Sequence, residues 1–201
     1  MNVSRQIGWS NESNLLYQIL KQLNRLSSIM FGLKPKYKVY TALLTQSGVS
    51  DLQYIVFPSL LTIGVTYQLD TPGVNADFTN VGAPNNLGGT YFVATGTTPN
   101  NWDSTLLAYD TGAPVVTVLE NTIGNVWFTY NNVGSYLVNS NNLFIEPKSM
   151  AIIGTPVETV SNNNFAGIVP TGPSVFVIDV VESGPINDLL YNTPIEIRVY
   201  N

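Results

Sequence analysis

Hydrophobic residues recur with a helical period in one stretch of this chain, from Asn11 to Leu33. The apolar side chains there are spaced alternately three and four residues apart, which is the heptad pattern of a coiled-coil seam. Leu at the first heptad position with Ile at the fourth favours three or more strands, so we expect a homo-oligomer, a homotrimer first. The predicted oligomer seam consists of Leu16, Ile19, Leu23, Leu26, Met30 and Leu33.

The predicted helix has clear ends, but it is short. Ser10 or Asn11 can cap its start, and Gly32 followed by Pro35 ends it. About twenty residues form roughly 30 Å of helix, which is fewer than three heptads and marginal for a helix by itself. The pattern therefore leaves an alternative open, in which the apolar face of the helix packs on the β domain of its own chain.

After residue 36 the pattern changes to short alternating segments separated by Gly, Pro, Asn and Ser, which is typical of β-strands. This spacing predicts a mainly β fold, an antiparallel β-sandwich-like domain that follows the N-terminal α-helix. Residues 154–173 are rich in Pro and Gly and are expected to form a long loop. Strands are expected at 37–45, 65–69, 76–81, 89–95, 105–109, 115–119, 126–130, 135–139, 142–146, 150–153, 174–181 and 195–200.

Charge is unevenly distributed along the chain. The first 38 residues hold six basic residues and one acid, a net charge of +5, while the rest hold two basic residues and twelve acids, a net charge of −10. The basic residues do not form a run, so the pattern favours docking on an acidic protein surface over binding to nucleic acid. The predicted docking residues are Val3, Arg5, Ile7, Trp9, Lys21 and Arg25.

The chain contains neither histidine nor cysteine. This excludes a Ser-His-Asp triad, a cysteine nucleophile and a thiolate metal site. Paired carboxylates can still cut glycosidic bonds, but the available acids lie at the ends of expected strands, as solvated acids usually do. The pairs considered are Asp179 with Glu182 and Asp103 with Asp110. We predict no catalytic residue and a protein that is not an enzyme.

Two further kinds of site were weighed. Asp70, Asn75 and Asp77 could offer oxygens to a cation, but their spacing matches no EF-hand loop and fits turn chemistry, so no metal or cofactor is predicted. Strand aromatics usually serve as core or cross-strand pairs, although some can stack on sugars. The aromatic candidates are Tyr91, Trp102, Tyr109, Trp127 and Tyr130, of which Trp102 is expected in an exposed loop.

No stretch predicts a membrane partner. Residues 1–9 lack the apolar core of a signal peptide, and the most apolar later stretch, Tyr54 to Val65, is short and interrupted by Pro58 and Gly64.

Three separated segments carry a resemblance to known proteins. They are YKVYTALLTQSG at 37–48, APVVTVLENTIGNVW at 113–127 and NTPIEIRVY at 192–200, and two further phrases, DFTNVGA at 77–83 and GTYFVATGTTP at 89–99, lie between the first two. Together these segments resemble structural proteins of tailed bacteriophages, and the chain is similar to head fibre proteins of crAss-like phages. The resemblance brings no catalytic residue with it, because the shared motifs are strands and turns.

The resemblance implies a component of the virion, anchored on another capsid, neck or tail protein through its N-terminal segment. An alternative is a tail- or collar-associated module that binds a receptor or a carbohydrate, with a host surface glycan as partner. A third and weaker alternative is a hydrolase of surface glycans. In many relatives the first two segments are nearly contiguous. We therefore expect an N-terminal anchor and helix at 1–35, a main β domain at 36–48 plus 112–201, and an inserted small β subdomain at 49–111.

Overall fold

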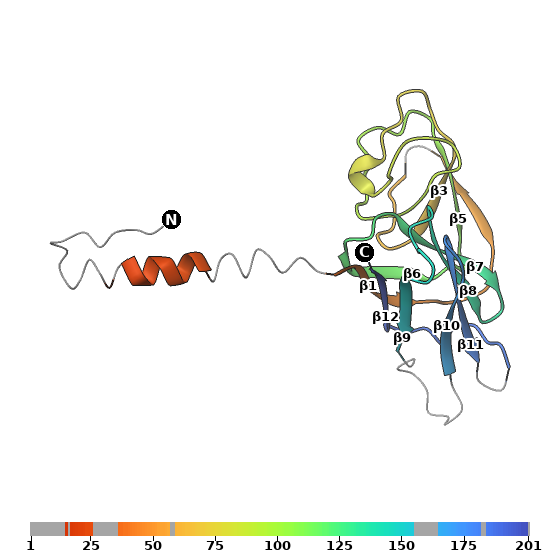
Figure 1. Ribbon diagram of the computed structural model, residues 1–201. Helices are drawn as coiled ribbons and strands as arrows, with labels where there is room; N and C mark the ends of the chain where they lie inside the picture. The colour runs from red at the N-terminus through yellow and green to blue at the C-terminus, as the bar shows by residue number, and fades with distance from the viewer. Residues whose placement is uncertain are drawn as a thin grey trace. The chain divides into compact units, whose positions relative to one another are not determined.

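The computed structural model describes residues 15, 17–25, 36–56, 59–154, 165–181 and 184–200. The chain divides into two compact units, Met1–Lys36 and Tyr37–Asn201. In the first unit residues 15 and 17–25 are helical, and the second unit contains twelve strands within its described residues (Figure 1). The predicted fold class, a mainly β protein with an N-terminal helix and antiparallel sheets, is confirmed. No helix among the described residues is long and apolar enough to cross a membrane.

The first sheet has the strand order β6-β1-β12-β9, with antiparallel neighbours throughout. Its central strand β1 alternates strictly, so that Tyr40, Ala42 and Leu44 point into the core while the residues between them are more exposed. The register sets Tyr40 opposite Ile197 of β12, which aligns the buried sides of the two strands. The bounds are β1 Tyr37–Thr45, β6 Val115–Asn121, β9 Ser149–Ile153 and β12 Thr193–Tyr200.

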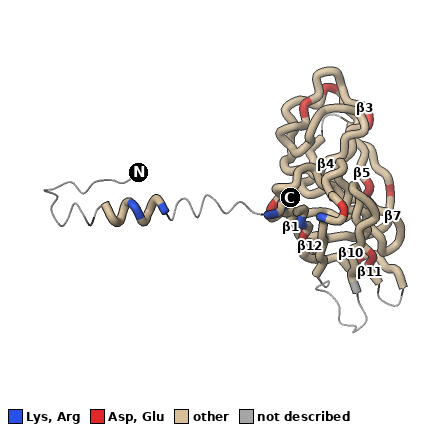
Figure 2. The backbone as a smooth tube through the Cα atoms, viewed as in Figure 1, with Lys and Arg blue, Asp and Glu red and all other residues tan. Residues whose placement is uncertain are grey.

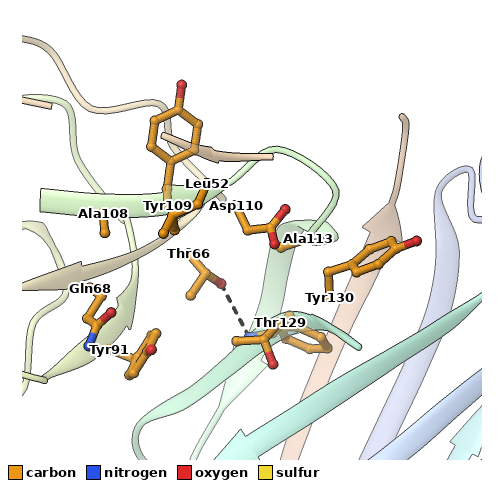
Figure 3. A pocket seen from close by; sticks show the side chains of 11 residues that line it. Leu52, Thr66, Gln68, Tyr91, Ala108, Tyr109, Asp110, Ala113, Thr129 and Tyr130 are labelled. Carbon is orange, nitrogen blue, oxygen red and sulfur yellow. Dashed lines mark hydrogen bonds between the residues drawn. The ribbon is translucent and has the colours of Figure 1, made fainter. Parts of the chain in front are cut away.

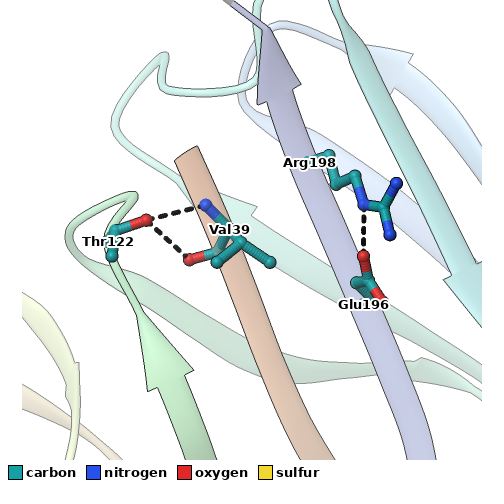
Figure 4. Close-up of polar contacts among 4 residues, drawn as sticks. All are labelled: Val39, Thr122, Glu196 and Arg198. Atoms are coloured by element: carbon teal, nitrogen blue, oxygen red, sulfur yellow. Dashed lines mark hydrogen bonds and ion pairs between the residues drawn. The ribbon is translucent and has the colours of Figure 1, made fainter. Parts of the chain in front are cut away.

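Polar contacts hold the outer side of this sheet. The hydroxyl of Thr122 accepts a hydrogen bond from the backbone N–H of Val39 at 2.7 Å and donates one to the carbonyl of Val39 at 3.1 Å (Figure 4). On β12, Arg198 forms an ion pair with Glu196, and its guanidinium lies 4.9 Å from the ring centre of Tyr37. These contacts fix the start of β1, the strand at which the second unit begins.

The second sheet has the order β10-β11-β8-β7 and packs against the first through one hydrophobic core. Phe128 of β7 and Ile178 of β11 are fully buried there, and the ring of Phe128 lies 6.2 Å from that of Tyr40 in β1. Because side chains of both sheets lie in this one core, the two sheets form a sandwich. Burial of each such side chain stabilises it by about 1.5–3 kcal/mol. The bounds are β7 Val126–Asn132, β8 Ser135–Ser140, β10 Phe165–Gly172 and β11 Val175–Val181.

The third sheet, of order β2-β5-β3-β4, is built from residues that lie between β1 and β6 in the chain. It has its own core cluster, in which Phe78 contacts both Phe92 and Trp102. The two ends of this chain segment lie close together, because the Nε2 amide of Gln46 donates to the carbonyls of both Gly48, at 2.9 Å, and Gly112, at 3.2 Å. The bounds are β2 Leu52–Ile55, β3 Thr66–Thr71, β4 Tyr91–Val93 and β5 Leu106–Asp110, with a short 3₁₀ helix, η1, at Thr79–Val81.

The third sheet is joined closely to the sandwich. The backbone N–H of Val116 in β6 donates to the carbonyl of Gly64 at 2.9 Å, and the N–H of Phe128 in β7 donates to the hydroxyl of Thr66 at 3.2 Å. Gly64 has φ +86°, and a Cβ there would lie 2.5 Å from the carbonyl oxygen of Val116, so only glycine fits. Residues 37–201 form one compact unit, and the independence of the inserted subdomain stays a prediction.

Several strand predictions were wrong in detail. Residues 142–146 are not a strand, because Asn142 has φ +57°, a left-handed conformation that ends β8 in a turn. The expected strand at 76–81 is η1 preceded by an isolated bridge at Asp77.

Two strands, β2 and β10, were not predicted from the sequence. Burial alternates along β2, but its more exposed positions hold the apolar residues Leu52 and Tyr54, which are 55% and 57% exposed, so the sequence does not show the usual pattern of a half-buried strand. Strand β10 lies within the expected loop, and residues 155–164 of that loop lie outside the described residues. Gly and Pro are tolerated in β10 because it is an edge strand of its sheet.

Candidate functional site

The helix of the first unit exposes its apolar side chains. Ile19 and Leu23, the two seam residues that the structure describes, are 47% and 55% exposed, and Leu15 and Leu20 beside them are more than half exposed. The other seam residues lie outside the described residues, namely Leu16, Leu26, Met30 and Leu33. The exposed face matches what a partner helix would cover. The homotrimer stays a prediction.

Of the predicted docking residues, the structure describes Lys21 and Arg25. Lys21 and Arg25 are exposed on the helix one turn apart, where Figure 2 shows them in blue. The other four, Val3, Arg5, Ile7 and Trp9, lie outside the described residues. The charges follow the division into units, since residues 1–36 hold five basic residues and one acid, and residues 37–201 hold three basic residues and twelve acids. A basic unit of this kind suits an acidic partner surface.

Two of the four carboxylates in the candidate catalytic pairs, Asp103 and Asp110, accept hydrogen bonds that hold nearby turns. Asp103 accepts a hydrogen bond from the backbone N–H of Asn75 at 2.6 Å. Asp110 accepts from the hydroxyl of Ser50 at 2.6 Å and from the N–H of Gly112 at 2.8 Å. Asp179 lies on β11, and its proposed partner Glu182 lies outside the described residues. These hydrogen bonds fix chain geometry, which is the structural role expected of acids at strand ends.

The polar loops around η1 form a network of side-chain hydrogen bonds. Asp77 accepts from Thr79 at 2.6 Å and from the amide of Asn100 at 2.9 Å, and these bonds lower its pKa from 3.8 to about 2. The hydroxyl of Thr71 donates to Asp70 at 3.1 Å. Within the described residues, no group of three or more acidic side chains is placed to hold a metal ion.

Trp102 does not have the exposed setting that we expected. It is 6% exposed and packs edge-on against Phe78, with ring centres 5.2 Å apart, so it belongs to the core of the third sheet. The loop that carries it folds inward because the N–H of Asn101 and that of Asp77 each donate to the other residue's carbonyl. Trp102 is therefore not available for stacking on a sugar.

A pocket of about 190 Å³ lies where the third sheet meets strand β7. The strand register builds one wall: Gln68 of β3 lies opposite Ala108 of β5 on one side and opposite Tyr91 of β4 on the other. Directly opposed residues project from the same face of a sheet, so these three side chains form one row. Leu52 opposite Asp110 forms a second row on this face.

Strand β7 supplies the other wall through Thr129 and Tyr130. The two walls are tied together by the hydrogen bond from the N–H of Phe128 to the hydroxyl of Thr66, which Figure 3 shows crossing between the strands. The hydroxyl of Thr129 accepts from the side-chain amide of Asn139 at 3.0 Å, which leaves its own proton for a ligand. The pocket therefore depends on contact between the inserted segment and the sandwich.

The three tyrosines of the pocket differ in their roles. Tyr91 stacks on Trp127 with ring centres 5.8 Å apart and planes 7° from parallel, and partial burial raises its pKa, so its hydroxyl keeps its proton. Tyr109 packs against Tyr67 at 5.5 Å, and Figure 3 shows its ring pointing away from Tyr91. Tyr130 lies edge-on to Tyr136. Tyr91 is thus the aromatic residue that is held in place beside Gln68.

Sequence reasoning named these three tyrosines as aromatic candidates, but it missed Thr66, Gln68 and Thr129. Their convergence depends on the pairing of β3 with β5 and on the hydrogen bond that joins β3 to β7, and these strands are separated in the chain. No local pattern marks such residues, because an isolated Gln or Thr on a strand is normally a solvated side chain. No family model, curated protein or solved structure matches this chain.

Proposed function

We propose that the protein is a structural component of a tailed-bacteriophage virion, a head fibre subunit that decorates the capsid. The proposal rests on the observation that the segments which carry the resemblance are neighbours in the fold. The three resembling segments correspond to β1, to β6 with the start of β7, and to β12. Strands β6, β1 and β12 are neighbours in one sheet, although they are far apart in the chain. The resembling parts thus make one structural module. The chain leaves this module after Gly48 and returns to it at Gly112.

The first unit suits the role of an anchor. Its helix exposes Ile19 and Leu23 on one side and carries Lys21 and Arg25 on another, so one helix can associate with its own copies and also face an acidic socket. Exposed ion pairs contribute about 0–1 kcal/mol each, so apolar contacts from residues 1–9 should supply most of the hold. Salt should therefore slow attachment more than it loosens the finished complex.

Immunogold electron microscopy tests the proposal. Antibodies raised against the purified protein should label the heads of phage particles that carry it. Particles assembled with a variant that lacks residues 1–10 should lose the label, whereas particles with Gln53→Ala, a matched change in the β domain, should keep it. Purified particles that contain none of the protein by mass spectrometry would contradict a virion role.

A second candidate is a tail- or collar-associated module that binds a receptor or carbohydrate. The pocket between the third sheet and β7 favours this candidate, because it presents an aromatic ring and polar groups together on the β domain. Gold label at the tail or neck in the same experiment would support this position and would argue against a head fibre.

A further inference from the structure

We propose that the pocket between the third sheet and β7 binds a single neutral sugar ring. This inference does not depend on the head fibre role, and it names the ligand class for the second candidate function described above. It rests on four features of the pocket, namely a fixed aromatic ring, uncommitted polar groups, the sign of its charge and its size.

The fixed ring is that of Tyr91. A sugar presents a face of C–H groups that packs on an aromatic ring, and such packing is strongest where the ring loses little freedom on binding. Tyr91 meets this condition because its ring is stacked on Trp127, and its carbonyl accepts a hydrogen bond from the side chain of Asn125 at 2.8 Å. Contacts to the sandwich therefore hold Tyr91 at the edge of the pocket before any ligand arrives.

Polar groups lie next to this ring. Gln68 is directly opposite Tyr91 in the strand register, it is half-buried, and its side-chain amide makes no hydrogen bond to another described residue. An amide offers two donors and an acceptor, which suits adjacent hydroxyls of a sugar. The small side chain of Ala108, on the other side of Gln68, leaves room above the sheet. Thr129 lines the opposite wall, and because its hydroxyl oxygen accepts from Asn139, the hydroxyl can still donate a hydrogen bond to a ligand.

The charge of the pocket selects a neutral ligand. Its lining contains no Lys or Arg, and its single charged group is Asp110. An anionic sugar would meet this carboxylate without a compensating cation. An aromatic cage for a quaternary ammonium needs several rings that face one point. The rings of Tyr109 and Tyr130 instead pack on Tyr67 and Tyr136, so they do not close such a cage around Tyr91.

The size of the pocket selects one ring. Pockets that hold drug-sized ligands measure roughly 300–1,000 Å³, whereas this one measures about 190 Å³. A hexose has about twelve non-hydrogen atoms, and a ligand of that size binds with a dissociation constant of about a few millimolar at ordinary ligand efficiency. A weak single site of this kind gains strength when several copies act together, as in an oligomer.

The experiment is an NMR titration of the ¹⁵N-labelled full chain with methyl glycosides of glucose, galactose, mannose, fucose and N-acetylglucosamine. Tetramethylammonium and sialic acid serve as the cationic and anionic probes. At least one neutral glycoside should saturate, with saturation-transfer signals on its ring protons and a shift of the Gln68 side-chain amide. That amide signal is assigned by its loss in Gln68→Ala.

Variants locate the site. Gln68→Ala should weaken binding about three- to tenfold, the scale of one lost hydrogen bond. Tyr91→Ala should weaken it more than Tyr91→Phe, which keeps the ring, and unfolding midpoints show whether the fold is intact. Gln53→Ala, which removes an amide from the other face of β2, should leave binding unchanged. The proposal is overturned if no neutral glycoside binds, if only a charged probe binds, or if Gln53→Ala weakens binding as much as Gln68→Ala.

Discussion

Gln46 is a buried polar residue on which three parts of the chain converge. Its Oε1 accepts from the hydroxyl of Tyr136 at 2.6 Å and from the backbone N–H of Asp188 at 2.8 Å. Its Nε2 donates to the carbonyls of Gly48 and Gly112, where the inserted segment leaves and re-enters the main domain. The side chain is only 2% exposed, so water cannot readily replace these bonds. We therefore expect Gln46→Ala to destabilise the β domain strongly.

The magnitude follows from the groups left without partners. After Gln46→Ala the hydroxyl of Tyr136 can still donate to Asn187, whose Oδ1 lies 3.1 Å away. The carbonyl of Gly112 and the N–H of Asp188 lose the partner described above. Each unsatisfied buried group costs about 1–3 kcal/mol, so the free energy of unfolding should fall by about 2–6 kcal/mol. This is a large part of the roughly 5–15 kcal/mol that a domain of this kind has.

Urea unfolding followed by tryptophan fluorescence measures this change. With a slope of about 2 kcal/mol per molar urea, the midpoint should fall by about 1–3 M at unchanged slope. Gln68→Ala is the matched control, because it removes the same amide from a site with no described hydrogen bond, and it should cost about 0.5 kcal/mol or less. Equal midpoints for Gln46→Ala and Gln68→Ala would refute the reasoning.

The variant Gln46→Glu gives a second readout. It places a carboxylate against the carbonyls of Gly48 and Gly112, which burial and repulsion disfavour, so the pKa of the introduced group should lie above its unfolded value of about 4.3. The folded state then binds the proton more tightly than the unfolded state. Stability should be lowest at neutral pH and should recover as pH falls through the raised pKa, where the protonated acid can donate to a carbonyl. A stability difference from wild type that does not change with pH would contradict this account.

Three further predictions concern the helix, the inserted segment and a surface carboxylate. Leu23→Asp should convert the oligomer to a monomer, measured by light scattering, while the β signal in circular dichroism stays intact. Gln18→Asp, which adds the same charge outside the seam, should leave the oligomer mass unchanged. Equal masses for Leu23→Asp and the wild type would contradict the seam. Deletion that joins Gly48 directly to Gly112 should leave a folded sandwich by circular dichroism, because Gln46 already holds these ends together, and global unfolding would show that the segment is part of the main core. The hydrogen bonds that lower the pKa of Asp77 stabilise the fold fully at pH values above its unfolded pKa of 3.8. The free energy of unfolding of the wild type relative to Asp77→Asn should therefore decrease as pH falls from 3.8 towards about 2. A difference that does not change with pH would contradict this role of the carboxylate.

The fold class was predictable because most strands bury one side. In β1, Tyr40 and Leu44 face the core and the residues between them do not, so periodicity alone gives the strand Tyr37–Thr45. The pattern fails where residue type does not match burial. Leu52 in β2 is an exposed apolar residue on an edge strand, and Trp102 is a loop residue that folds back on its own subdomain. Both depend on contacts with residues far away in the chain, which a local pattern does not contain.

The candidate site was less predictable for a related reason. Tyr91 could be named from its residue type, but its role depends on Trp127, which stacks on it from the main domain. Gln68 acquires significance only from the register that puts it between Ala108 and Tyr91. Charge segregation, in contrast, is visible directly in the sequence, because it requires no knowledge of pairing. The anchor could therefore be proposed from composition, whereas the pocket needed the structure.

The position of the pocket links the inserted segment to the proposed ligand. One wall comes from the inserted sheet and the other from β7, so neither part makes the site alone. Strands β6, β1 and β12, which lie side by side, contribute no residue to the lining of this site. The side chain of Gln46 holds Gly48 and Gly112 together, so the inserted segment leaves and rejoins the main domain at one point. Attachment to a particle and recognition of a sugar would then be separable properties, the first carried by the N-terminal unit and the second by the inserted segment against β7.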